Sequence, residues 1–138
     1  MLRILYLSTA TGRPDDPSLQ RILEVSRRNN RRADVTGVLC AGGEHFLQVL
    51  EGPDDAVMET YHRIRHDPRH TQATLLDIDL IDARLFPEWS MAHIAGSSSD
   101  EAIRSALRAV QRNTNRRGHV LATLRAFVQI HRLRAVTP

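Results

Sequence analysis

The segment from Phe46 to Gly52 carries a single amide, Gln48, inside a run of large apolar residues. In an extended chain these side chains point to both sides, so the run predicts a strand buried on both faces of a sheet. A buried amide without a partner costs about 1–3 kcal/mol, so Gln48 needs a hydrogen bond. Because an amide both donates and accepts, rotating or rearranging it would exchange the two roles. Gln48 is therefore a candidate for a two-state switch.

Further strand-like runs surround this segment. Leu2 to Leu7 predicts a first strand, and Val35 to Ala41 predicts a second strand that forms a hairpin with Phe46 to Leu50. Thr74 to Ile81 predicts a fourth strand, and Glu88 to His93 predicts a short fifth one.

Two helices are predicted between these strands. Asp16, followed by a proline, is typical of an N-cap, and the helix that it opens is predicted to run to about Asn29. Asp54 is the predicted N-cap of a second helix, which must end near Asp67 because a proline follows. The order β-α-β-β-α-β-β predicts a ferredoxin-like α+β fold. In that topology the first and third strands are adjacent and both helices cover one face of the sheet.

The C-terminal part of the chain is predicted to be helical. After a serine-rich joint at Gly96 to Asp100, apolar residues at helical spacing predict two amphipathic helices, with a break from Asn113 to Gly118. We expect residues 1–95 to form the main domain. Residues 96–138 are expected to form a helical extension that serves as an interaction or oligomer surface.

Composition narrows the function classes. The 138 residues include one cysteine, Cys40, which excludes an internal disulfide and a cysteine-based zinc site. No apolar run approaches the ~20 residues of a membrane span, and no signal peptide is recognisable, so a cytoplasmic location without membrane contact is predicted. All 19 basic residues are arginines, clustered at 27–32 and after Asp100. Such clusters are typical of a solvated helix face, an acidic partner or nucleic acid.

Several polar residues stand where they could either stabilise the fold or bind a ligand. Tyr6 and Gln48 occupy the centres of two strands predicted to be adjacent, so they can pair with each other. Asn29 and Asn30 are compatible with a helix C-terminus, or with recognition of a polar ring edge. Arg63 and Asp67, at spacing i and i+4, fit an ion pair or the polar tail of a ligand.

Other patterns are less specific. His62, His66 and His70 have metal-like spacing, but a proline ends the helix before His70, so no metal site is predicted. Trp89 and Met91 alternate on the predicted fifth strand, which fits core packing as well as a site. No catalytic triad, P-loop or dinucleotide-binding glycine motif is present, and the chain is not predicted to be an enzyme.

Five motifs follow one another between about Leu2 and Ile94: Leu5-Tyr6-Leu7-Ser8; Ser26-Arg27-Arg28-Asn29-Asn30 with Val35-Thr36-Gly37-Val38-Leu39; Phe46 to Gly52; Tyr61-His62-Arg63-Ile64 with Asp67 and Arg69-His70; and Trp89-Ser90-Met91. In this order, and on these elements, they resemble the BLUF family of blue-light sensors that use flavin. The resemblance is to the short type, in which no output domain is fused to the sensor.

The resemblance implies a non-covalently bound FAD between the two predicted helices, with FMN and riboflavin as alternatives. It implies that Tyr6 donates an electron and a proton, that Gln48 bridges the phenol and the flavin, and that Trp89 and Met91 relay the state of Gln48. The flavin would be contacted by the remaining motif residues: Ser8, Asn29, Asn30, Arg63, Ile64 and Asp67.

The resemblance also implies what the protein does. Light would change the hydrogen bonds of Gln48 and shift the flavin absorption slightly to the red, and the signal would pass to a separate protein partner. A homo-oligomer is expected. The alternatives from the sequence are a basic nucleic-acid-binding module, for which the sheet has too few aromatic residues, and a small ferredoxin-like hydrolase, for which no nucleophile is recognisable.

Overall fold

A mixed five-stranded sheet with the strand order β4-β1-β3-β2-β5 forms the centre of the protein. The computed structural model describes residues 1–10, 16–42, 44–68, 70–87, 90–94 and 97–112. Its strands are β1 (Leu2–Ala10), β2 (Thr36–Gly42), β3 (His45–Gly52), β4 (His70–Leu80) and β5 (Ala92–Ile94), and its helices are α1 (Asp16–Ala33), α2 (Asp54–Arg65) and α3 (Ser97–Arg112).

The element order confirms the predicted α+β fold, with β1 next to β3. β1 to β4 pair antiparallel with their neighbours, whereas β5 pairs parallel to β2. The fifth strand is shorter than predicted: it begins at Ala92, so Met91 precedes it, and Trp89 lies outside the described residues. The fourth strand is longer than predicted, since it already begins at His70 rather than at Thr74.

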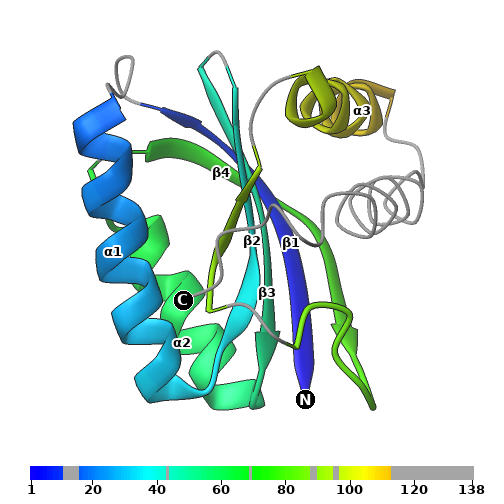
Figure 1. The fold of residues 1–138 in the computed structure, drawn as a ribbon. Coiled ribbons are helices and arrows are strands. Elements are labelled where there is room, and N and C mark those ends of the chain that lie inside the picture. The colour runs from blue at the N-terminus through cyan, green and yellow to red at the C-terminus, as the bar shows by residue number, and fades with distance from the viewer. Residues whose placement is uncertain (11–15, 43, 69, 88–89, 95–96, 113–138) are drawn as a thin grey trace.

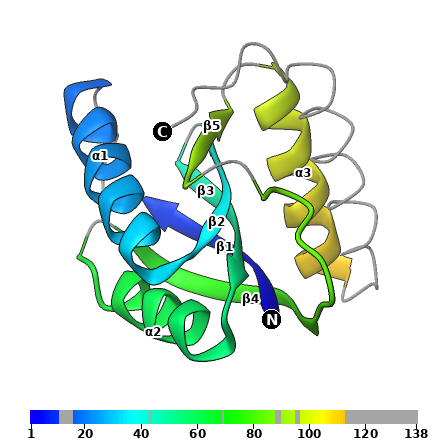
Figure 2. The ribbon, with the colours of Figure 1, turned by 60° about the horizontal axis from the view of Figure 1, so that its bottom comes forward.

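The sheet is covered on both faces. α1 and α2 lie on one face and α3 on the other, as Figures 1 and 2 show. Two separate cores result. The core under α1 and α2 contains Leu2, Ile4, Tyr6, Leu23, Val35, Leu39, Phe46, Leu50, Val57, Tyr61 and Met91, and the core under α3 contains Leu5, Leu7, Val38, Cys40, Leu47, Val49, Phe86, Ala92, Ala102, Ile103 and Ala106. From Phe46 to Gly52 every residue of β3 is buried, as the sequence predicts.

α1 ends later than predicted, and this changes the interpretation of its two asparagines. The helix continues to Ala33, and the left-handed residue that follows is Asp34, with φ of 58°. The Val35 amide donates to the Asn30 carbonyl at 2.8 Å, which is the closing bond of a Schellman motif. Asn29 and Asn30 therefore lie inside the helix and do not end it, so the helix-terminal explanation for them is wrong.

The start of α2 also differs from the prediction. Pro53 occupies the N-cap position and no side chain caps the helix, so Asp54 is the first helical residue and not the cap. Its carboxylate instead lies 3.4 Å from the Met1 nitrogen. An acidic residue in the first turn still interacts favourably with the helix dipole.

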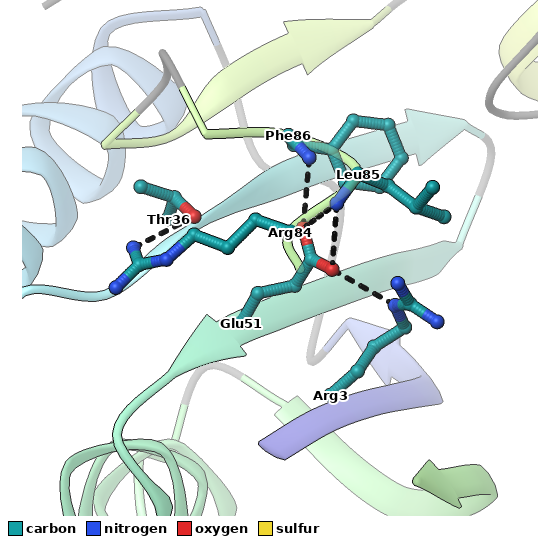
Figure 3. A network of polar contacts seen from close by, with 6 residues as sticks. All are labelled: Arg3, Thr36, Glu51, Arg84, Leu85 and Phe86. Atoms are coloured by element: carbon teal, nitrogen blue, oxygen red, sulfur yellow. Dashed lines mark hydrogen bonds and ion pairs between the residues drawn. The ribbon is translucent and has the colours of Figure 1, made fainter. Parts of the chain in front are cut away.

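A buried carboxylate ties the connection between β4 and β5 to the sheet. Glu51 has no exposed surface, and it accepts hydrogen bonds from the backbone amides of Leu85 at 3.0 Å and Phe86 at 2.8 Å. Its other polar contact is an ion pair with Arg3 on β1 at 2.9 Å. Figure 3 shows Glu51 reaching from β3 to these groups. The 85–86 segment is therefore fixed on the α3 side of the sheet.

Arg84, which directly precedes the Leu85–Phe86 segment held by Glu51, contacts the end of α1. Its guanidinium contacts the Asp34 carboxylate at 3.1 Å, the Asp34 carbonyl at 2.9 Å and the Thr36 hydroxyl at 3.2 Å. These contacts hold Asp34 in its left-handed conformation.

Within the described ranges, no helix has the length and hydropathy that a membrane span requires. The second predicted C-terminal helix lies outside the described residues.

Candidate functional site

A cleft opens between α1 and α2 over the sheet face that they cover. Its atom-free space, counted out to the open mouth and including open solvent, is about 800 Å³. Side chains from α1, α2, β2 and β3 line it: Ile22, Val25, Ser26, Asn29, Asn30, Leu39, Phe46, Gln48, Thr60, Arg63, Ile64 and Asp67. The set includes most of the residues predicted from the sequence to bind a cofactor.

Gln48 lines this cleft, and Tyr6, which does not line it, lies behind Gln48 in the core. They are direct partners in the register of β1 and β3, and the Tyr6 hydroxyl donates a hydrogen bond to Gln48 Oε1. Tyr6 is fully buried, and its ring lies 5.1 Å from the ring of Tyr61 between centroids. Burial, and secondarily Tyr61, raises the pKa of Tyr6 well above its ordinary value. The phenol is therefore a protonated hydrogen-bond donor at neutral pH.

The other end of the Gln48 amide faces Met91. Gln48 Nε2 donates to Met91 Sδ at 3.4 Å, and Met91 is fully buried in the core on this face. The two ends of the amide thus have different partners, a hydroxyl donor for the oxygen and a thioether acceptor for the nitrogen. Of the two predicted relay residues, the structure places Met91 at Gln48. Trp89 lies outside the described residues.

Asn30 and Arg27, both on α1, bind the backbone of this same segment. Asn30 is 2% exposed, and its Nδ2 donates to the Ser90 carbonyl at 2.6 Å. Arg27 Nε donates to the Met91 carbonyl at 2.9 Å. Burial, and then the neighbouring Arg31, lowers the pKa of Arg27 from its ordinary value. The short β5 has a physical reason here, because side chains of α1 occupy the carbonyls just before it.

The remaining predicted site residues lie in two groups. Asn29, Arg63, Ile64 and Asp67 line the cleft, with Asn29 on α1 and the others on or just after α2. Ser8 does not line it: this residue is 1% exposed, two positions beyond Tyr6 on β1.

The sequence interpretation missed several apolar and small residues of the cleft, among them Ile22, Val25 and Thr60. A signal for them was available. The cleft residues of α1 at 22, 25, 26 and 29 and those of the α2 region at 60, 63, 64 and 67 share the spacing i, i+3, i+4, i+7. Two helices that present such stripes from the same sheet face enclose a common space.

Two of the three histidines with metal-like spacing, His62 and His66, contact each other near the end of α2. The rings of His62 and His66 are tilted by 51° with centroids 4.4 Å apart, and His66 Nδ1 contacts the His62 carbonyl at 2.8 Å. Across the residues that the structure describes, no three His, Cys, Asp or Glu side chains are grouped so that they could hold a metal ion.

The chain is similar to known light sensors. A family model described as sensors of blue-light using FAD (BLUF) matches residues 1–92. The photoactivated adenylate cyclase subunit beta of Euglena gracilis is 38% identical over 89 residues, which cover 64% of this chain and 10% of that protein. The blue light- and temperature-regulated antirepressor of Escherichia coli (strain K12) is 38% identical over 81 residues, which cover 57% of this chain and 20% of that protein. The chain thus spans a small part of these relatives.

Solved structures share the fold. A BLUF protein, BlrB, in its dark state superposes with a TM-score of 0.72 at 32% identity, covering 92% of this chain and 93% of that one. A bacterial light-regulated adenylyl cyclase superposes with a TM-score of 0.68 at 34% identity, covering 82% of this chain and 34% of that one.

Proposed function

The chain belongs to the BLUF family, sensors of blue light that use FAD, and from this premise we propose that it is a photoreceptor with FAD held in the cleft between α1 and α2. The single observation that carries the proposal is the chain of contacts from Tyr6 through Gln48 to Met91, of which Gln48 lines that cleft. Residues 1–95 would form the photosensor and residues 96–138 its extension. The protein would signal to a separate partner and convert no substrate.

The lining of the cleft combines apolar and polar side chains in a way that supports flavin binding. Its walls are largely apolar, with Ile22, Leu39 and Phe46 among the residues that would contact a flat ring. Polar side chains stand at separate points of the lining. Asn30 and Gln48, 2% and 5% exposed, reach the buried end. Arg63 and Asp67 lie on the α2 side and would contact the ribityl and phosphate tail as donor and acceptor. FAD is proposed over FMN or riboflavin on the family description.

When bound, a flavin supplies blue-light absorption and an excited state that accepts an electron. Tyr6 would be the donor, because its buried, protonated phenol is bonded to Gln48, which lines the cleft, and can release its hydroxyl proton to the Gln48 oxygen. The electron and the proton would both return to Tyr6, so that no net oxidation takes place. A Gln48 amide that has rotated or rearranged would present a donor where it now presents an acceptor. In the case of rotation, its oxygen would face the Met91 thioether, which has no proton to donate.

Rotation of the Gln48 amide would remove its hydrogen bond to Met91. In the present arrangement the amide oxygen and the amide nitrogen each have a partner, and rotation would replace the contact between Nε2 and Sδ with one between two acceptors. The strain falls on Met91, which directly precedes β5. Gln48 and Met91 would in this way pass the signal toward β5, α3 and the extension, where we place the surface for a protein partner or for a homo-oligomer.

The nucleic-acid alternative has less support from the structure. RNA-recognition folds stack bases on aromatic residues of an open sheet face. Here α1 and α2 cover one face, and α3 packs on the opposite face through Ala102, Ile103 and Ala106.

The test is a visible spectrum of the purified protein with FAD in the dark, after blue light and after dark recovery. We expect a flavin spectrum that shifts slightly to the red and returns. Gln48→Leu and Tyr6→Phe should each retain flavin and lose the shift. Tyr61→Phe, the same chemical change at the neighbouring ring, should retain it. A protein that stays colourless with FAD, or a Gln48→Leu variant with a full reversible shift, would refute the proposal.

A further inference from the structure

Two consecutive carbonyls just before β5 are held by one face of α1. Arg27 Nε binds the Met91 carbonyl at 2.9 Å, and Asn30, one turn further along the helix, binds the Ser90 carbonyl at 2.6 Å. Both bonds join residues 60 or more positions apart in the sequence. The side chain of Met91 points to Gln48 at 3.4 Å, so the residue that contacts the amide is attached to α1 through its own backbone.

The segments on both sides of Met91 are fixed independently of α1. Upstream, the Glu51 carboxylate holds the Leu85 and Phe86 amides (Figure 3). Downstream, Ala92 already pairs with Val38 of β2. Between these two anchors the bonds from Asn30 and Arg27 both restrict the backbone, and of the two only that from Arg27 is made to Met91 itself. Because its donor is a guanidinium, this bond is stronger than one between neutral groups.

Resting on the light switch proposed above, we propose that Arg27 is a positioning residue of that switch. It holds the Met91 backbone so that the thioether stays against the Gln48 amide. Arg27 thereby sets the rate at which the Gln48 amide returns to its dark-state arrangement after illumination. Arg27 does not line the cleft and would not touch the flavin.

The effect on the rate follows from the packing around Gln48. An amide that returns to its starting orientation must pass Met91 Sδ before Nε2 can bind it again. A thioether held by Arg27 is a fixed obstacle in a core where Met91 and Tyr6 are both fully buried. Without the bond to its carbonyl, Met91 can move aside, and the amide should return faster.

The experiment compares Arg27→Met with the matched control Arg28→Met in the FAD-bound full chain. Arg28 is the exposed neighbour of Arg27 on α1, and its replacement by Met removes the same charge and the same hydrogen-bond donors. Flavin content, the size of the red shift, the time constant of dark recovery and the thermal unfolding midpoint are measured for each. We expect Arg27→Met to bind flavin and shift normally but to recover about five- to tenfold faster, the rate change typical of one lost hydrogen bond. Arg28→Met should recover within twofold of the wild type.

Two further variants separate positioning from general stability. Arg27→Lys keeps a cationic donor and should restore most of the wild-type lifetime, whatever its unfolding midpoint. In a Met91→Leu background, Arg27→Met should change recovery by less than twofold, because the contact through which Arg27 acts is absent.

The outcomes distinguish this inference from the proposed function. A wild-type protein without a reversible red shift would refute both. A wild-type protein that cycles, with an Arg27→Met variant that recovers within twofold of it or more slowly, would refute the role of Arg27 alone. An equal effect of Arg27→Met in the wild type and in the Met91→Leu background would also overturn it, since Arg27 would then act independently of the thioether.

Discussion

Replacing Glu51 with Gln changes one buried oxygen to an amino group and leaves the shape of the side chain almost unaltered. In the wild type, one carboxylate oxygen accepts from the Phe86 amide at 2.8 Å and the other from Arg3 Nε at 2.9 Å, while the Leu85 amide lies 3.0 Å from both. All of these partners are donors. A carboxamide can serve the two backbone amides with its oxygen, but its nitrogen then faces the Arg3 guanidinium.

The expected loss follows from these contacts. Glu51 is fully buried and the Arg3 side chain is 13% exposed, so solvent screens their ion pair only weakly. Breaking a buried pair by removing one partner costs about 3–5 kcal/mol when nothing replaces it. Here the two backbone bonds survive with a neutral acceptor, so we expect Glu51→Gln to lower the free energy of unfolding by about 2–3 kcal/mol.

The assay is chemical unfolding in urea, with the thermal midpoint as a second measurement. The midpoint should fall by roughly 6–15 °C for a chain of this size. The control is Glu59→Gln, which removes the same charge from an exposed position on α2 and should stay within about 0.5 kcal/mol of the wild type. In an Arg3→Met background the loss from Glu51→Gln should be smaller, because the ion pair is already gone. Equal stability of the two glutamine variants would refute the argument.

Two further predictions concern the two cores. Because the pKa of Tyr6 is raised in the folded state, stability is retained below the unfolded value of about 10 and lost as pH rises toward the folded value. Urea unfolding from pH 8 to 11 should show this decline and Tyr6→Phe should reduce it, so an unchanged decline in that variant would contradict the argument. Ile103→Ala, at a site 4% exposed between α3 and the sheet, should lower the free energy of unfolding by about 2–4 kcal/mol. The same change at Ile78, which is 46% exposed, should lower it by under about 1 kcal/mol. Similar losses of stability in both variants would show that α3 adds little to that core.

Much of the fold could be predicted because it depends on local patterns. The apolar run around Gln48 indicates a buried strand, and the structure buries that run from Phe46 onward. The pairing of Tyr6 with Gln48 followed from the topology, since the split order places β1 beside β3.

The errors lie where distant residues decide a boundary. α1 continues to Ala33 because Asp34 adopts a left-handed conformation that Arg84, far along the chain, holds in place. β5 begins after Met91 because α1 side chains occupy the Ser90 and Met91 carbonyls. These contacts cannot be predicted from the local sequence of the helix or strand whose end they determine.

The sequence by itself indicated the order of the strands and helices and the pairing of Tyr6 with Gln48, because hydrophobic periodicity and turn chemistry act within a few residues. Only the tertiary structure decided which groups those side chains contact. The bond between Tyr6 and Gln48 spans 42 positions and that between Arg27 and Met91 spans 64. The orientation of the Gln48 amide and the burial of Glu51 both depend on such contacts. Folding creates these contacts by bringing distant segments together, and no pattern of neighbouring residues encodes them.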